Sequence, residues 1–228
     1  MTPAARRVNT LAHLLNGRRY LEIGVENGGT FRGVEMAERT GVDPVFLFDT
    51  SSLADEFTRF VPKTSDEFFA TEPLFPSYDV IFIDGLHTFE QVVRDLSNVL
   101  LRTHRRSVII LDDTVPSDVY SALPEQSMAI KYRKAAGGSG GSWHGDVFKT
   151  VFYIHDFWPS LNYRTIVDAS NPQTLVWRAN GVRRLPLFNS LEAICRLNYF
   201  HMRENMDVMQ TAVEEEAIAL CVAEVKAL

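Results

Sequence analysis

The chain has 228 residues, of which 46% are hydrophobic and 23% charged, a balance typical of a soluble globular protein rather than a disordered or collagen-like one. Its formal net charge of -6 argues against a general nucleic-acid binder, which needs a basic surface to displace counterions. Only two cysteines occur, so neither a disulfide scaffold nor a thiolate metal cluster is expected. There is no continuous apolar stretch for a signal peptide or a membrane span, so we expect a cytoplasmic protein without membrane or nucleic-acid partners.

The N-terminal third of the chain alternates helical patterns with short apolar runs. Apolar residues at helical spacing predict helices, and short apolar runs bounded by glycine predict strands. The predicted elements are an opening helix over 8–15, a strand over 20–24, a helix around 34–37, strands over 41–43 and 45–48, and a helix over 65–69 with Ser65 as its N-cap.

The middle of the chain contains two fully apolar runs, 78–83 and 107–111, which are typical of strands buried on both faces of a parallel sheet. Between them, apolar residues from Phe89 to Leu100 recur at helical spacing and predict a helix. Further along, the expected elements are a closing pair of strands at 163–167 and 174–177, and helices after Ser190.

Strands separated by helices pair in parallel through right-handed crossovers. We therefore predict an α/β fold with a Rossmann-like, doubly wound, mostly parallel seven-stranded sheet, helices on both faces and a C-terminal helical extension. The sheet domain is expected to span 1–185, and residues 186–228 would form the extension. The sequence leaves open whether this extension packs on its own sheet or on a partner subunit in a homodimer.

A glycine- and serine-rich stretch, KAAGGSGGSWHGD at 134–146, interrupts this order. Such a composition is flexible, and inside a compact domain it is typical of a mobile lid over a site. Trp143 and His144 at its end would then contact substrate. The alternative is a loose surface loop in which Trp143 tethers the next helix.

Acidic residues follow the two fully apolar strands, and the carboxyl ends of parallel strands share the edge of the sheet where ligands bind. Asp84 follows the first of these strands and Asp112-Asp113 the second, and His87 lies three residues after Asp84. A structural explanation is also open. In that reading Asp84 and Asp112 cap helices, while Asp113 and His87 are solvated.

A glycine-containing turn, Glu22 to Thr30, follows the first strand. Its spacing matches neither the dinucleotide-binding G-x-G-x-x-G nor the phosphate-binding G-x-x-x-x-G-K-[ST] pattern, which disfavours a nicotinamide-dependent oxidoreductase. Glu22 would repel a pyrophosphate and suits a positively charged ligand. Asp43, about 20 residues after the first glycine, has the position of the ribose-binding acid of nucleoside-binding α/β folds.

Five segments together resemble the class I S-adenosylmethionine-dependent methyltransferases, in the branch of macrocin O-methyltransferase and related natural-product sugar O-methyltransferases. They are YLEIGVENGGTF, GVDP, TSDEFF, YDVIFIDGLHTFEQVVRDL and VIILDDTVP, and the likeness spans about residues 20–180. The resemblance implies S-adenosylmethionine as cofactor. It places Glu22, Gly24, Gly28 and Thr30 at the methionine part, Asp43 at the ribose, Ser65 and Asp66 at the adenine, and Asp84 also in the cofactor site.

The same resemblance implies a magnesium ion bound by Asp84, Asp112 and Asp113. Converging carboxylates repel one another, and a hard divalent cation with oxygen ligands offsets that repulsion. The ion would chelate a hydroxyl of a small-molecule acceptor, a natural product or sugar, and His87 would take the proton as general base. The alternative is a protein of this fold that binds the cofactor and performs other chemistry or none, because fold does not fix function.

Overall fold

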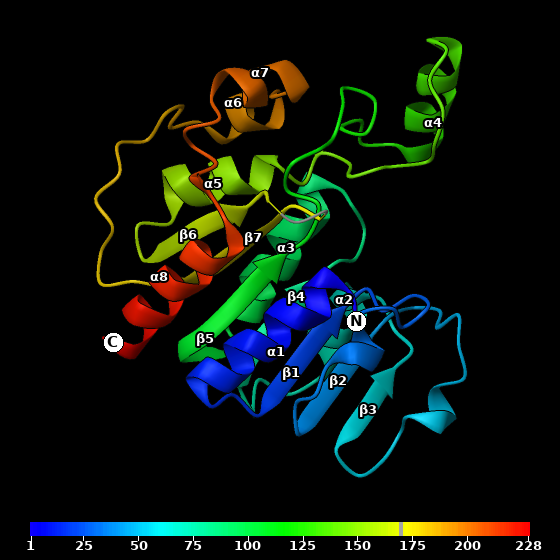
Figure 1. Ribbon diagram of the computed structural model, residues 1–228, viewed down its shortest axis with the longest axis vertical. Coiled ribbons are helices and arrows are strands. Elements are labelled where there is room, and N and C mark those ends of the chain that lie inside the picture. The colour runs from blue at the N-terminus through cyan, green and yellow to red at the C-terminus, as the bar shows by residue number, and fades with distance from the viewer. Residues whose placement is uncertain (169–170) are drawn as a thin grey trace.

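The computed structural model describes residues 1–168 and 171–228, which form one eight-stranded sheet with helices on both faces (Figure 1). The strands are β1 (Arg19–Ile23), β2 (Glu38–Val42), β3 (Thr58–Val61), β4 (Tyr78–Ile83), β5 (Thr103–Leu111), β6 (Leu161–Ile166), β7 (Gln173–Arg178) and β8 (Thr211–Ala212). Their order across the sheet is β3-β2-β1-β4-β5-β7-β6-β8, and only β7 runs antiparallel to its neighbours. The predicted Rossmann-like, mostly parallel architecture is confirmed, with one strand more than the seven expected.

Helices cover both faces of this sheet. They are α1 (Pro3–Leu15), α2 (Ser65–Thr71), α3 (Phe89–Leu100), α4 (Gln126–Ala135), α5 (Lys149–Phe157), α6 (Leu191–Cys195), α7 (Tyr199–Glu204) and α8 (Glu214–Lys226). Among the described residues, none of these helices has the length and apolarity needed to cross a membrane. α4 stands away from the sheet at the end of a long excursion of the chain (Figure 1).

Alternate residues of the central strands point to opposite faces and contribute to two hydrophobic cores. Val80 and Phe82 of β4 pack in the core that α1 and α8 cover. Ile81 and Ile83 pack in the core that α2, α3 and α5 cover. None of these four side chains is more than 2% exposed, so the strand predicted to be buried on both faces is confirmed.

The carboxyl ends of β1, β4 and β5 lie level with one another. Ile23 pairs with Ile83, and Ile83 pairs with Leu111. The amide of Asp84 donates a hydrogen bond to the carbonyl of Ile23 (2.8 Å), and the amide of Asp112 donates to the carbonyl of Ile83 (3.1 Å). The residues that follow these three strands therefore meet at one edge of the sheet, as the sequence predicted.

Two elements predicted between β1 and α2 are wrong. In place of a helix around 34–37 there is one 3₁₀ turn, η1 (Phe31–Gly33), and α1 packs on this side of the sheet against β4 and η1. The run at 45–48 is not a strand, and β3 lies later in the chain. Phe46 and Phe48 of that run pack their rings against Phe60 of β3 instead, which explains their apolar pattern.

The remaining differences are small. Thr64 rather than Ser65 caps α2, and it forms a reciprocal capping box with Glu67. In the C-terminal part, β8 interrupts the helical pattern predicted after Ser190, and α8 packs on β6 and β7 of its own sheet. Pairing of the C-terminal helices with a second copy, and a domain boundary at residue 185, stay predictions.

Candidate active site

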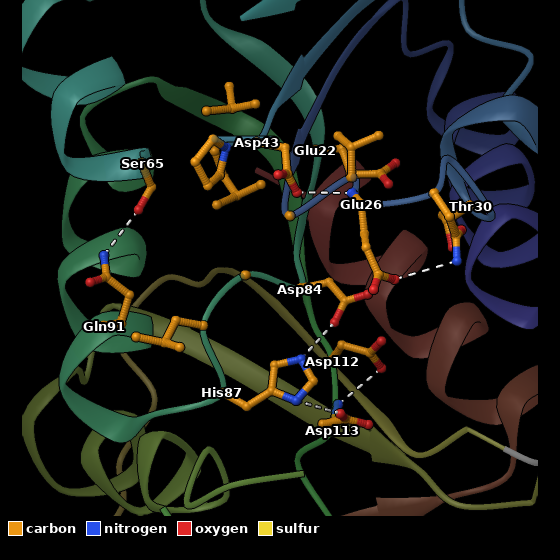
Figure 2. Close-up of a pocket in the computed structure, with 18 of the residues that line it drawn as sticks. Glu22, Glu26, Thr30, Asp43, Ser65, Asp84, His87, Gln91, Asp112 and Asp113 are labelled. Atoms are coloured by element: carbon orange, nitrogen blue, oxygen red, sulfur yellow. Dashed lines mark hydrogen bonds and ion pairs between the residues drawn. The ribbon is translucent and has the colours of Figure 1, made fainter. Parts of the chain in front are cut away.

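A cavity of about 840 Å³ opens at the carboxyl edge of the sheet, a size typical of small-molecule sites (Figure 2). The acidic residues that line it are Glu22, Glu26, Asp43, Asp66, Asp84, Asp112 and Asp113. Among the described residues that line the cavity there is no lysine or arginine. The cavity therefore suits a positively charged ligand and disfavours a pyrophosphate.

Gly24 lies where the turn after β1 passes the end of β4. Its φ is +87°, and a Cβ atom there would lie 2.0 Å from the carbonyl oxygen of Asp84, so only glycine fits. Gly28 also has a positive φ, +76°, but it is not one of the cavity-lining residues, and a Cβ there would lie 3.0 Å from the ring of Phe48. The structure thus explains Gly28 by the packing of the turn against Phe48, and its contact with a cofactor stays a prediction.

Glu22 lines the cavity and is only 1% exposed. The hydroxyl of Tyr20 donates a 2.6 Å hydrogen bond to its carboxyl group. Burial raises the pKa of Glu22 to about 8, and the negative charges of Asp112 and Asp43 act in the same direction, while the bond from Tyr20 opposes them. A cation beside Glu22 would favour its ionised form, so this carboxyl group is matched to a cationic ligand.

Ionisation of Glu22 gives the ligand-free protein a pH-dependent stability. Its pKa is higher in the folded state, about 8, than its ordinary value of 4.5, so the folded state binds the proton more tightly and loses stability as pH rises between these values. Glu22→Gln should reduce this loss, on the order of 3 kcal/mol, because each pKa unit corresponds to about 1.4 kcal/mol. Urea unfolding at pH 5 and pH 8 measures it. Glu56→Gln, on an exposed loop, is the control, and equal pH dependence in both variants would contradict the assignment.

Asp43 holds the glycine-containing turn against the end of β2. Its carboxylate oxygens accept a 2.8 Å hydrogen bond from the backbone amide of Glu26 (Figure 2) and another of 2.8 Å from that of Val45. Each carboxylate oxygen has a further lone pair, and Asp43 lines the cavity, so it can also accept hydrogen bonds from ligand hydroxyls. Thr30, which lines the cavity from the far end of the turn, places its hydroxyl 3.2 Å from that of Thr2.

Ser65 and Asp66 reach the cavity from the first turn of α2. The amide of Gln91 on α3 donates to the Ser65 hydroxyl (3.0 Å; Figure 2) and to the Asp66 carboxylate (3.3 Å), so hydrogen bonds join the two helices here. Sequence reasoning missed Gln91, which also lines the cavity. The signal that could have identified it is a polar pair, Gln91 and Asp95, spaced four residues apart on one side of α3.

His87 lies between two carboxylates (Figure 2). Its Nε2 is 3.2 Å from Asp84 and its Nδ1 is 3.1 Å from Asp113. Burial alone would lower the pKa of His87, but the hydrogen bond to Asp84 and the charges of Asp113 and Asp84 raise it to about 9. Burial and the charge of Asp112 raise the pKa of Asp113 to about 7, and burial raises that of Asp84 well above its ordinary value. The three groups are therefore arranged to share protons near neutral pH.

Asp112 is turned away from this cluster. Its carboxylate accepts hydrogen bonds from the side-chain amides of Gln173 (3.0 Å) and Asn171 (3.3 Å) and from the backbone amide of Asp113 (2.9 Å). Asp112 still lines the cavity, with 7% exposure. Sequence reasoning did not single out Asn171 or Gln173, and no spacing marks them, since they lie at the start of an antiparallel strand.

Asp84, His87 and Asp113 each offer one potential metal ligand, and these atoms lie within 4.8 Å of one another. Buried carboxyl groups with raised pKa fit a divalent cation, whose charge favours their ionised forms. Oxygen ligands suit Mg²⁺, whereas an imidazole ligand suits metals such as Zn²⁺ or Fe²⁺. Binding of Mg²⁺ by these residues would therefore involve the carboxylates and leave His87 for proton transfer.

The glycine-rich stretch reaches the same cavity. Gly141 and Trp143 line it, and Nε2 of His144 lies 3.7 Å from the carboxylate of Asp113. Burial and the charge of His87 lower the pKa of His144. The stretch therefore lies over the site, and its opening and closing stay a prediction.

Residues 21–114, which run from within β1 to just past β5 and include the carboxyl groups of the cavity, match a family model described as a methyltransferase domain. No curated protein sequence is similar to the chain at a significant level. The fold extends the likeness beyond the matched residues. The family match and the shared fold both support the predicted resemblance to class I methyltransferases.

Three solved structures illustrate the shared fold. One is the O-methyltransferase TomG from Streptomyces achromogenes, involved in tomaymycin synthesis, in complex with SAM (14% identity, 78% of this chain, 80% of that chain, TM-score 0.52). Another is the O-methyltransferase from Bacillus cereus in complex with SAH (14% identity, 78% of this chain, 82% of that chain, TM-score 0.52). A third is the SAH-bound Podospora anserina methyltransferase PaMTH1 (11% identity, 78% of this chain, 83% of that chain, TM-score 0.51). At these identities the likeness concerns the fold.

Proposed function

We propose that the protein transfers a methyl group from S-adenosylmethionine to a hydroxyl group of a small natural product or sugar. The observation that carries the proposal is the charge of the cavity, which has seven acidic residues and no lysine or arginine among its described lining. S-Adenosylmethionine carries a sulfonium and an ammonium group, so an acidic cavity favours it over phosphate-bearing cofactors. The cofactors bound in two similar structures, SAM and SAH, support the same choice.

The positions of the lining residues agree with this cofactor. Glu22, whose buried carboxyl group favours a nearby cation, would face its methionine part together with Gly24 and Thr30. Asp43 would accept hydrogen bonds from the ribose hydroxyls. Ser65 and Asp66 on α2 would contact the adenine.

Proton transfer would be the task of His87. The backbone carbonyl of Trp143, 3.2 Å from Nδ1, can only accept a hydrogen bond, so Nδ1 keeps its proton and Nε2 is the atom that receives one. A cation bound to Asp84 and Asp113 would offset the charges that raise the pKa of His87, and the neutral imidazole would then take the proton of the acceptor hydroxyl at Nε2. The acceptor oxygen then attacks the methyl carbon in line, the carbon–sulfur bond breaks, and S-adenosylhomocysteine leaves.

A magnesium ion is also proposed, as in the macrocin O-methyltransferase branch that the sequence resembles. Asp84 and Asp113 would hold it, with Asp112 beside them. The chemistry the ion supplies is polarisation of the acceptor hydroxyl as a Lewis acid. The amides of Asn171 and Gln173 fix the orientation of the Asp112 carboxylate, which lies beside the site and would add to its negative charge.

Calorimetric titration tests these proposals separately. We expect wild-type protein to bind S-adenosylmethionine and S-adenosylhomocysteine, and to bind Mg²⁺ at least about tenfold more tightly than Asp84→Asn does, because that variant removes a ligand charge. Asp49→Asn, an exposed acid outside the cavity, is the matched control and should behave as wild type. Absence of cofactor binding under all conditions would overturn the methyltransferase proposal. Cofactor binding without a magnesium heat would overturn only the metal.

A further inference from the structure

The end of the glycine-rich stretch is docked on the turn that carries His87. The rings of Trp143 and His87 are stacked, with centroids 5.0 Å apart and planes inclined by 22°. The backbone carbonyl of Trp143 accepts from Nδ1 of the same imidazole at 3.2 Å. We call residues 143–146 the docked segment, and Trp143 is its only ring in contact with His87 among the described aromatic pairs.

Two further residues of the docked segment hold the same turn. Asp146, 8% exposed, accepts a 2.7 Å hydrogen bond from the amide of Phe89, the first residue of α3. The N-cap residue of α3, Thr88, makes no side-chain hydrogen bond of its own, so Asp146 supplies the missing cap from a distant part of the chain. Gly145 has φ of +61°, and a Cβ there would lie 1.6 Å from the carbonyl oxygen of His87.

The other side of the docked segment is fixed to the loop before α4. The indole Nε1 of Trp143 donates a hydrogen bond to the carbonyl of Leu123 at 2.7 Å. The backbone amide of His144 donates one to the carbonyl of Ser121 at 3.0 Å. By contrast, a Cβ at Gly140 or Gly141 would meet nothing within 4 Å. The stretch therefore joins an open glycine-rich part to a segment that is anchored on both sides.

From these contacts we propose that Trp143 is a positioning residue for His87, and that Asp146 acts with it by holding the docked segment on the turn. This rests on the proposed function, in which His87 receives the acceptor proton. His87 has a carboxylate at each ring nitrogen, and a ring attracted from both ends needs a constraint on its plane. The stacked indole supplies that constraint while its backbone carbonyl selects the protonated nitrogen.

Nuclear magnetic resonance of histidine-labelled protein tests the proposal without an acceptor. The indole ring current should displace the ring-proton signals of His87 upfield. Trp143→Ala should remove this displacement and broaden the signals, and Trp143→Phe should retain part of it, because a smaller aromatic ring still stacks. His13, His104, His155 and His201 lie outside the site and serve as internal references. Unchanged His87 signals in Trp143→Ala would overturn the proposal.

A second pair of variants keeps the test valid if Trp143→Ala does not fold. Asp146→Asn keeps an oxygen to accept from the Phe89 amide, whereas Asp146→Ala removes it. We expect the His87 displacement to persist in the first and to be lost in the second, although both retain Trp143. An equal displacement in the two variants would overturn the role of Asp146. Titration of S-adenosylhomocysteine into the wild type is a separate arm, and its failure would overturn the proposed function but leave the assignment of the His87 contact standing.

Discussion

Gly24→Ala is expected to lower the free energy of unfolding by about 4 kcal/mol, the combined effect of a left-handed backbone and an overpacked contact. The backbone at Gly24 has φ of +87°, and the added Cβ would lie 2.0 Å from the carbonyl oxygen of Asp84. That carbonyl belongs to the chain at the end of β4, a strand in the centre of the sheet, so it cannot yield without disturbing the core. Urea unfolding followed by circular dichroism gives the difference.

Gly137→Ala is the matched control for this clash. Gly137 has a nearly equal φ of +82°, but a Cβ there would meet nothing within 4 Å. We expect Gly137→Ala to lower the free energy of unfolding by only about 1 kcal/mol, the cost of the left-handed backbone conformation. If both variants lowered the free energy of unfolding equally, the close approach of Gly24 to Asp84 would not contribute to the loss of stability.

Asp43→Ala is expected to weaken the binding of S-adenosylhomocysteine by about 100-fold, or roughly 2.7 kcal/mol. The variant removes two hydrogen bonds that hold the turn, from the amides of Glu26 and Val45, together with the proposed contacts to the ribose. Hydrogen bonds to a charged group contribute about 1.5–3 kcal/mol each, so loss of a large part of the affinity follows. Asp43→Asn keeps one acceptor oxygen and should lose about tenfold. Isothermal titration calorimetry measures both.

Asp49→Ala provides the comparison for this loss. Asp49 makes a similar local bond, to the amide of Ser51 at 3.0 Å, but is exposed and does not line the cavity. Its affinity for S-adenosylhomocysteine should equal that of the wild type. An Asp43→Ala protein that is folded and binds as tightly as Asp49→Ala would show that Asp43 only shapes the loop.

The mostly parallel sheet and the edge where the site lies were predictable because both depend on strong local signals. A continuous apolar run such as 78–83 can be satisfied only by burial on both faces, and parallel strands must end at one edge. The helix expected around 34–37 failed because Val34 and Met36 are buried for another reason, beneath the packed α1. Such long-range replacement of one element by another leaves no trace in a short window of sequence.

Within the site, residue type was more predictable than orientation. Asp84, Asp112 and Asp113 do lie together at one edge, yet only Asp84 and Asp113 approach His87. Which way Asp112 turns is decided by amides from β7 and the residues before it, which sequence spacing does not connect to it. The docking of Trp143 on His87 likewise depends on a contact across 56 positions of the chain.

The reversed direction of β7 divides the site between two parts of the chain that are not equally recognisable. Leu111 at the end of β5 pairs with Thr174 near the beginning of β7, so the start of an antiparallel strand meets the end of a parallel one. The amides on Asp112 therefore come from beyond the residues matched by the family model, which stop at 114. A chimaera built by grafting only that matched portion onto another scaffold would carry every acid of the cavity but leave Asp112 without its two side-chain donors. A graft that keeps the site intact must therefore include the sheet as far as β7 and the residues just before that strand.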